Sequence, residues 1–221
     1  MAFGTLYGVK NNVRTTGVLA VAKEIGLDLN FVSVDLANPT AEHLKANKLG
    51  KIPTFVGEDG FALSECIAIL VYFTAQSNNT SLSGKTKQDY ASILKWLSFA
   101  NSEIIPSLAG WYRPLRGAIP YDKKSVDDSA KATLKAVEIM EDQLTDHPFL
   151  VGETLSLADL FTAGVLSRGF QFLFDKKFRA ENPHITRWFE TVTSQPSYSA
   201  VTDKVELLNT PAPANVDPKR A

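Results

Sequence analysis

The spacing of apolar residues divides the chain into a first part that mixes strands with helices and a second part that is helical. In the first part, short apolar runs of strand length alternate with longer runs that have helical spacing. These patterns predict strands at residues 5–9, 29–34, 54–56 and 61–63, and helices at residues 15–25, 41–46 and 65–75. The alternation of side chains along residues 29–34 favours a strand with one face fully buried.

The order of these elements predicts how the strands pair. The first two strands flank a helix and should lie parallel, because such crossovers join parallel strands. The last two strands are joined by a glycine-bounded turn at residues 57–60, which is typical of a hairpin, so they should lie antiparallel. The predicted fold class is therefore an α/β N-terminal domain with a thioredoxin-like layout, followed by an all-α C-terminal domain.

A polar stretch at residues 77–86 marks the predicted boundary between the two parts. Helical spacing then continues at residues 88–105, 124–144, 157–174 and 185–192. Pro106 should interrupt the first of these helices, and the almost wholly apolar residues 157–174 should form the central buried helix. The proline-rich end of the chain has little to bury and should be extended or disordered. The predicted units are residues 1–76, 87–205 and 206–221.

Composition narrows the classes of function. The chain has 221 residues, 23 basic and 24 acidic, with a net charge of -1, so we expect no nucleic-acid partner. The single cysteine, Cys66, allows no internal disulfide and fits a reducing compartment. The sequence contains no leader pattern at its start and no apolar run of membrane-spanning length, so we expect a cytoplasmic protein with no membrane partner.

The histidines do not point to a metal site. His43, His147 and His184 lie far apart and lack the spacing typical of metal ligands, so we expect no metal.

Two short motifs in the first part carry the clearest chemical signal. Pro53 stands at the entrance to a strand, where a cis bond after Ile52 would turn the backbone outward to pair with a peptide. A trans proline on an edge strand is the alternative. Glu65 and Cys66 then open a helix whose free N–H groups can hold a carboxylate, although Glu65 can also be a surface acid favoured by the helix dipole. Together the motifs predict a site for a small acidic peptide.

The predicted buried helix carries its own start signal. Ser156 and Asp159 have the spacing of a capping box, in which each side chain bonds the backbone of the other. We assign this pair a role in folding and none in catalysis.

These motifs resemble the glutathione site of the cytosolic glutathione transferase superfamily, and within it the transferase-like N-terminal domain of fungal elongation factor 1B gamma. The resemblance covers about residues 3–205, and the stretches that carry it most specifically are residues 51–55, 82–99, 101–103, 120–124 and 179–189. It implies the glutathione transferase fold and glutathione as co-substrate. It also implies a homodimer, or a hetero-oligomer with elongation-factor subunits if the chain serves translation.

The resemblance further implies how glutathione is held. Lys51 would touch the glycyl carboxylate, Ile52 would pair with the cysteinyl backbone, and Pro53 would shape this edge. Glu65 and Cys66 would hold the γ-glutamyl end. The family usually has serine at the position of Cys66, and because a thiol is a weaker donor we expect weaker glutathione binding.

The sulfur of glutathione is expected at the start of the first helix. The family places a tyrosine, serine or cysteine there, whereas this chain has Lys10, Asn11 and Asn12 shortly before Arg14. A cation at Lys10, or amide and helix-start N–H donors at Asn11 and Asn12, can stabilise a thiolate. These four residues are the catalytic candidates implied by the resemblance.

The second substrate is expected to meet the aromatic segment Trp111, Tyr112 and Arg113, which falls where the family's helical domain faces the thiol. Simple core packing is the alternative for this segment.

Two functions follow from the resemblance. The first is a glutathione transferase that acts on a small electrophile by conjugate addition, or that isomerises it in a secondary-metabolite pathway when the adduct reverses. The second is a non-catalytic assembly domain of the translation elongation factor 1B complex. The Pro- and Ala-rich tail, in place of a Lys-rich linker, favours a stand-alone enzyme.

Overall fold

Four strands form one sheet in the computed structural model, which describes residues 2–77 and 81–219. The strands are β1 (Gly4–Gly8), β2 (Leu29–Ser33), β3 (Thr54–Gly57) and β4 (Ala62–Ser64), in the order β2-β1-β3-β4. β1 and β2 are parallel, whereas β3 pairs antiparallel with both β1 and β4. The predicted pairing of the first two and the last two strands is therefore confirmed.

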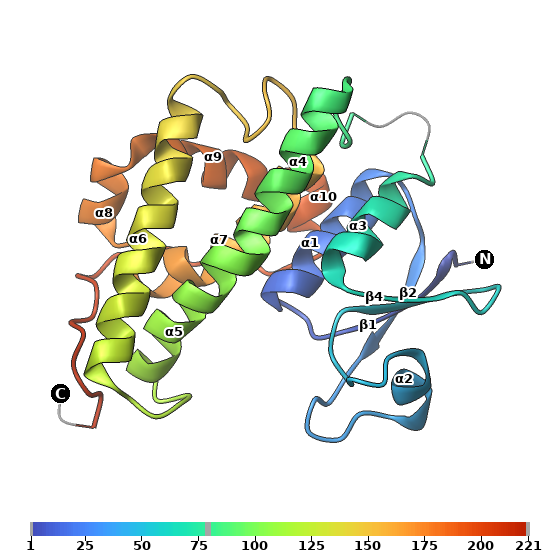
Figure 1. Ribbon diagram of the computed structural model, residues 1–221, viewed down its shortest axis with the longest axis horizontal. Helices are drawn as coiled ribbons and strands as arrows, with labels where there is room; N and C mark the ends of the chain where they lie inside the picture. The colour runs from blue at the N-terminus through green and yellow to red at the C-terminus, as the bar shows by residue number, and fades with distance from the viewer. Residues whose placement is uncertain (1, 78–80, 220–221) are drawn as a thin grey trace.

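Three helices accompany the sheet in this described part of the chain: α1 (Val13–Glu24), α2 (Ala41–Ala46) and α3 (Cys66–Thr74). α1 and α3 pack together on one side of the sheet, and α2 lies on the other (Figure 1). α1 ends where Gly26 adopts a φ of 72°, a left-handed conformation that glycine reaches without steric cost. The β-α-β-α-β-β-α order predicted from the sequence is present.

The prediction that residues 29–34 bury one face fully is wrong. Along β2, Leu29 is half-buried, and the next four residues are all exposed, including Phe31 and Val32. The reason lies in the topology, because β2 is an edge strand that pairs only with β1 within the described sheet. The apolar pattern could not reveal which strand would lie at the edge.

The second part of the molecule is built of helices (Figure 1). They are α4 (Lys87–Phe99), the π-helical turn η1 (Ala100–Ile104), α5 (Ile105–Leu115), α6 (Lys123–Thr145), α7 (Leu157–Phe172), α8 (Lys176–Glu181), α9 (Pro183–Thr193) and α10 (Pro196–Ser199). The sequence patterns predicted α4, α6, α7 and α9 and did not predict η1, α5, α8 or α10 as separate elements. The short α8 is begun by the Asp175 side chain, which accepts from the Phe178 N–H.

Pro106 does not interrupt its helix as predicted. It sits in the first turn of α5, where a missing N–H costs no helical bond. The preceding turn η1 is wound with wider π-type bonds, one of which runs from the Ile105 N–H to the Ala100 carbonyl. The chain therefore stays helical from α4 through η1 into α5, and Asn101 lies in η1.

α7 is the central buried helix, as its apolar sequence predicts. It packs against α1 at two glycines, Gly17 and Gly164, where a Cβ would approach the Phe161 Cα and the Val13 carbonyl oxygen to 2.8 Å. Side chains larger than hydrogen would push the two helices apart. This close contact joins the helical part to the α/β part directly behind the start of α1.

The start of α7 is closed by a buried carboxylate. Asp159 is fully buried and accepts from the N–H groups of Leu150 and Ser156, from the Ser156 hydroxyl and from the Trp188 indole, at 2.6–2.9 Å. Burial raises the pKa of Asp159, and these donors oppose the rise. The pair predicted as a capping box therefore also ties α7 to α9.

Residues 206–219 contain no helix or strand and run along the outer side of the helical part (Figure 1). The Leu208 N–H donates to the Phe170 carbonyl, and the Ala212 N–H donates to Asp175. Asn215 receives a bond from the Trp111 indole at 2.8 Å. The tail is thus extended and anchored at several points over this range.

None of the helices in residues 2–77 and 81–219 is both long and apolar enough to cross a membrane.

Candidate functional site

A cavity of about 500 Å³ opens beside the first turns of α1 and α3. Its volume is within the range of small-molecule sites. The walls come from the start of α1, the loop before β3, the start of α3 and the turn η1. They comprise Asn12, Arg14, Leu36, Asn47, Leu49, Gly50, Lys51, Ile52, Pro53, Glu65, Cys66 and Asn101. The cavity therefore collects all five residues predicted to hold glutathione and two of the four predicted to meet its sulfur.

The Ile52–Pro53 peptide bond is cis and lies in the cavity wall. Behind it, the Lys51 carbonyl accepts from the Asn47 amide at 3.0 Å and from the Thr54 hydroxyl at 2.8 Å. The His43 ring, fully buried and stacked on Tyr7, places Nε2 3.1 Å from the same oxygen. These polar contacts fix the backbone that leads into Ile52.

The start of α3 is open toward the cavity. Glu65 precedes the helix with φ 69° and ψ 114°, a conformation that non-glycine residues rarely adopt. Across the described residues, no side chain caps this helix, so the first N–H groups of α3 are not closed off by the protein. A helix N-terminus in this state carries a partial positive charge and favours an anion.

The start of α1 is capped by a residue of the cavity wall. The Asn12 side-chain oxygen accepts from the Arg14 and Thr15 N–H groups at 3.0 and 3.2 Å. Because the oxygen is used in this way, the Asn12 NH₂ group is left as the donor. Arg14 is held by a bond from its Nε to Asn101 Oδ1 at 3.2 Å.

Cys66 is buried in the same wall and is a thiol at neutral pH. Burial, the largest cause, raises the pKa of Cys66, and the nearby Arg14 charge partly offsets the rise. Its sulfur lies 3.9 Å from Asn101 Oδ1 and donates to it. A raised pKa disfavours the thiolate, so this environment does not make Cys66 a nucleophile.

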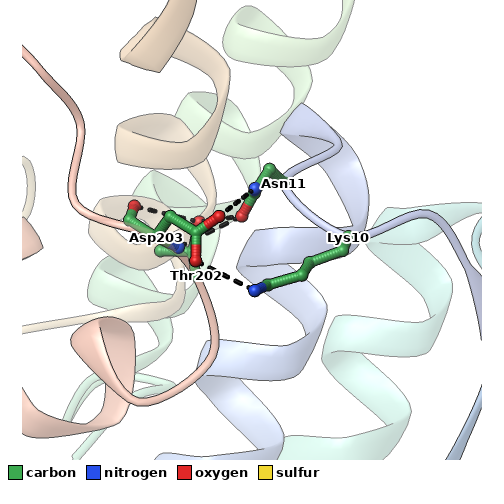
Figure 2. A network of polar contacts seen from close by, with 4 residues as sticks. All are labelled: Lys10, Asn11, Thr202 and Asp203. Atoms are coloured by element: carbon green, nitrogen blue, oxygen red, sulfur yellow. Dashed lines mark hydrogen bonds and ion pairs between the residues drawn. The ribbon is translucent and has the colours of Figure 1, made fainter.

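The other two sulfur candidates are placed elsewhere. Lys10 and Asn11 turn away from the cavity and reach the segment after α10 (Figure 2). Lys10 Nζ pairs with Asp203 at 2.9 Å, and Asn11 Nδ2 donates to the other oxygen of that carboxylate at 2.8 Å. The prediction that these two residues meet the sulfur directly is therefore not supported by their geometry.

The aromatic segment predicted to meet the second substrate also lies away from this cavity. Trp111 is buried in the helical core and bonded to Asn215 of the tail. Tyr112 stacks on Phe172 with ring centroids 5.8 Å apart, and the Arg113 side chain is exposed. Core packing, the alternative reading, describes Trp111.

The sequence did not predict the residues that hold the cavity wall in place through hydrogen bonds. Asn101 joins Arg14 to Cys66, and the His43, Asn47 and Thr54 side chains converge on the Lys51 carbonyl. These residues come from separate elements and share no motif. For Asn101 the one usable signal was its place in a stretch of family resemblance, residues 101–103.

A second cavity, of about 490 Å³, lies between α9, α10 and the segment that follows them. Its walls include Phe189, Tyr198 and Leu207, and it contains none of the predicted glutathione ligands. The cavity at α1 and α3 combines an open helix start with two cations, Arg14 and Lys51, as an anionic peptide requires. No group of three or more His, Cys, Asp or Glu side chains that could hold a metal is found in the part of the chain that the structure describes.

Both halves of the chain match known family models. Residues 2–74 match the model described as glutathione S-transferase, N-terminal domain, and residues 80–196 match the one described as glutathione S-transferase, C-terminal domain.

Several curated proteins are similar over most of this chain. Glutathione S-transferase psoE of Aspergillus fumigatus is 47% identical over 100% of this chain and 92% of that protein. Glutathione S-transferase stcT of Emericella nidulans is 43% identical over 89% of this chain and 90% of that protein. Elongation factor 1-gamma 1 of Saccharomyces cerevisiae is 37% identical over 89% of this chain, which spans only 48% of that longer protein.

A solved structure has the same architecture. The crystal structure of the GST-like domain of elongation factor 1-gamma from Saccharomyces cerevisiae superposes with a TM-score of 0.84 and 34% identity, covering 97% of this chain and 100% of that one.

Proposed function

Because the chain belongs to the glutathione S-transferase family of enzymes, we propose that it binds glutathione in the cavity at α1 and α3 and transfers it to a small electrophile. The observation that carries the proposal is the uncapped start of α3, which faces the same cavity as the cis Ile52–Pro53 edge and the two cations. The fungal relatives named glutathione S-transferase support it.

In this proposal, each part of glutathione meets a different element. The γ-glutamyl carboxylate accepts from the N–H groups at Glu65 and Cys66, and the Glu65 carboxylate pairs with the γ-glutamyl ammonium group. The cysteinyl backbone pairs with Ile52 in strand fashion, next to Pro53. Lys51, exposed at the rim, meets the glycyl carboxylate.

The thiol is activated at the start of α1. Asn12 donates its NH₂ group toward the sulfur, and Arg14 adds a fixed positive charge. A free thiol has a pKa of about 8.5, and each unit by which the site lowers it stabilises the anion by about 1.4 kcal/mol. Neither residue takes the proton, which leaves to solvent when the thiolate forms.

The thiolate then adds to an activated carbon–carbon double bond. Sulfur supplies the electron pair for the new C–S bond, the π pair moves to the neighbouring carbonyl, and a solvent proton completes the adduct at the α-carbon. When the adduct loses the same proton and thiolate after rotation about the former double bond, the net reaction is cis–trans isomerisation and glutathione is regenerated. A small electrophile from a fungal secondary-metabolite pathway is the substrate class we propose.

We also propose that the chain acts in the cytoplasm as a homodimer. Its single cysteine fits a reducing compartment, and the exposed Phe61 and Tyr90 offer apolar surface to a second copy. Light scattering on the purified chain measures this directly, and a monomer mass would overturn the dimer.

A second candidate function is assembly within the translation elongation factor 1B complex. It is favoured by the TM-score of 0.84 with the GST-like domain of elongation factor 1-gamma. A chain with this role would capture elongation-factor subunits and would not need to ionise a thiol.

Calorimetric titration with reduced glutathione separates the two functions. We expect saturable binding by the wild-type chain and loss of at least about tenfold in affinity in Glu65→Ala, with no loss in Glu138→Ala on the exposed face of α6. The absence of binding at millimolar glutathione would overturn the enzyme proposal.

A further inference from the structure

Asn11 occupies a strained point between the proposed thiol donor and the C-terminal half of the chain. Its φ is 60°, in the left-handed region that favours glycine. The next residue, Asn12, starts α1 and lines the cavity, and its N–H closes a tight turn onto the Val9 carbonyl. The conformation of Asn11 therefore sets where Asn12 sits.

The side chain of Asn11 is held by the segment after α10 (Figure 2). Its NH₂ group donates to Asp203 Oδ2 at 2.8 Å. Its oxygen accepts from the Thr202 hydroxyl at 2.8 Å and from the Asp203 N–H at 3.1 Å. Both ends of this amide are thus engaged by residues about 190 positions away in sequence.

The backbone of Asn11 is held as well. Its carbonyl accepts from Arg168 Nη2 at 3.0 Å, and Arg168 is in turn held by a bond from Nη1 to Gln171 at 2.6 Å. Arg168 belongs to α7, the central helix that also packs closely on α1. The left-handed turn is therefore fixed against the central buried helix of the helical part.

We propose that Asn11 is a positioning residue for the glutathione thiol, a role that presupposes the transferase function proposed above. Held by Arg168, Thr202 and Asp203, Asn11 keeps Asn12 in its place in the cavity wall. Asn11 does not touch the thiol itself. The C-terminal segment thereby takes part in thiol activation without lining the glutathione cavity.

The proposal rests on the bonds to Asn11 taken together, including the one from Arg168, and not on the ion pair of Lys10. The side chains of Lys10 and Asp203 are 65% and 66% exposed, and ion pairs at such positions contribute little. The charged groups that line the cavity and would face the thiol are Arg14, Lys51 and Glu65, and none of them bonds Asn11. Changes at Asn11 or Asp203 therefore leave these charges in place.

The test compares variants that break the bonds to Asn11 with variants that keep them. Asn11→Gly removes all of its side-chain bonds yet suits a positive φ, so the turn can still form. Asp203→Ala removes one bond to Asn11, and Asp203→Asn keeps an acceptor oxygen at that place. Glu138→Ala breaks an exposed Lys–Glu pair on α6 of similar exposure and serves as the matched control.

The readouts are the thiolate absorbance of bound glutathione against pH and the separate kcat and KM for glutathione. In Asn11→Gly we expect the pKa of the bound thiol to rise by about one unit and kcat to fall about tenfold below that pKa, with KM changed by less than about twofold. Asp203→Ala should shift both in the same direction by less, while Asp203→Asn and Glu138→Ala should match the wild type.

The outcomes separate this inference from the function on which it rests. A wild-type chain that binds no glutathione overturns the proposed function, and the role of Asn11 with it. A wild-type chain that ionises bound glutathione, with an unchanged thiol pKa in both Asn11→Gly and Asp203→Ala, overturns only the role of Asn11. A rise in KM with no change in thiol pKa would likewise overturn it, because that is the result of a merely structural defect. If Asn11→Gly does not fold, Asp203→Ala decides by the same criteria.

Discussion

The starts of α3 and α7 solve the same physical problem in opposite ways. Every helix begins with N–H groups that have no partner inside the helix. At α7 the protein supplies partners: the Leu157 N–H donates to the Leu82 carbonyl at 3.0 Å. The buried Asp159 also closes this start, because it accepts from the Ser156 N–H and hydroxyl and ties in Leu150 and Trp188. At α3, by contrast, no side chain in the described residues caps the helix, and the preceding residue, Glu65, is held in a strained conformation.

The difference separates a helix start that serves folding from one that we propose serves binding. α7 begins in the apolar core, where an unpaired N–H would be costly, so its partner is internal. α3 begins at the wall of a cavity, where a ligand carboxylate can be the partner. Substitutions at α7 should therefore change stability, and substitutions at α3 should change glutathione affinity.

The largest expected effect is at the start of α7. Asp159→Ala leaves four buried hydrogen-bond donors without their acceptor. We expect the free energy of unfolding to fall by at least about 3 kcal/mol, measured by chemical denaturation. Ser156→Ala should cost about 1 kcal/mol. An Asp159→Ala variant that folds with wild-type stability would show that the carboxylate at the start of α7 does not stabilise the fold.

At the start of α3, removing the charged residue should raise stability instead of lowering it. Glu65→Gly relieves the positive φ, so we expect the free energy of unfolding to rise by about 1 kcal/mol. The same change removes a carboxylate proposed to hold glutathione, and affinity should fall at least about tenfold. Glu65→Ala is the matched variant, because it loses the carboxylate and keeps the strain. A loss of stability in Glu65→Gly would contradict the view that strain is stored at this position.

A smaller effect is expected from Cys66→Ser. A hydroxyl is a better donor than a thiol, so glutathione affinity should rise by about two- to fivefold, as measured by calorimetry. An affinity that falls would mean that Cys66 contributes through packing and not as a donor.

The smallest effect is expected in the reactivity of Cys66, measured as its rate of alkylation. Burial raises the pKa of Cys66, so its thiolate is scarce at neutral pH. Alkylation should be slow at pH 7 and should accelerate only above about pH 8.5, the usual pKa of a free cysteine. Glutathione should slow it further. Rapid labelling at pH 7 would contradict the buried, protonated thiol.

The helices, the strands and the motif at Pro53 could be predicted from the sequence because their signals are local. Helical spacing located α1, α6, α7 and α9, and the motif around Pro53 with the helix start at Glu65 identified one wall of the cavity. These features depend on neighbours within a few positions, which a sequence pattern records directly.

The predicted placements that the structure does not support involve side chains held by distant segments of the chain. Lys10 and Asn11 look like thiol donors beside Asn12, but Asp203 turns both away from the cavity. Trp111 looks like a pocket wall, but Asn215 of the tail accepts its indole bond. Neither contact has a local signature, since the partners lie more than 100 residues apart.

The most direct test of the central claim is a crystal structure of the chain with glutathione. We expect the γ-glutamyl carboxylate within about 3.2 Å of the Cys66 N–H at the open start of α3, and the sulfur next to the Asn12 NH₂ group. Glutathione bound in another cavity, or bound here with its γ-glutamyl end away from α3, would contradict the account.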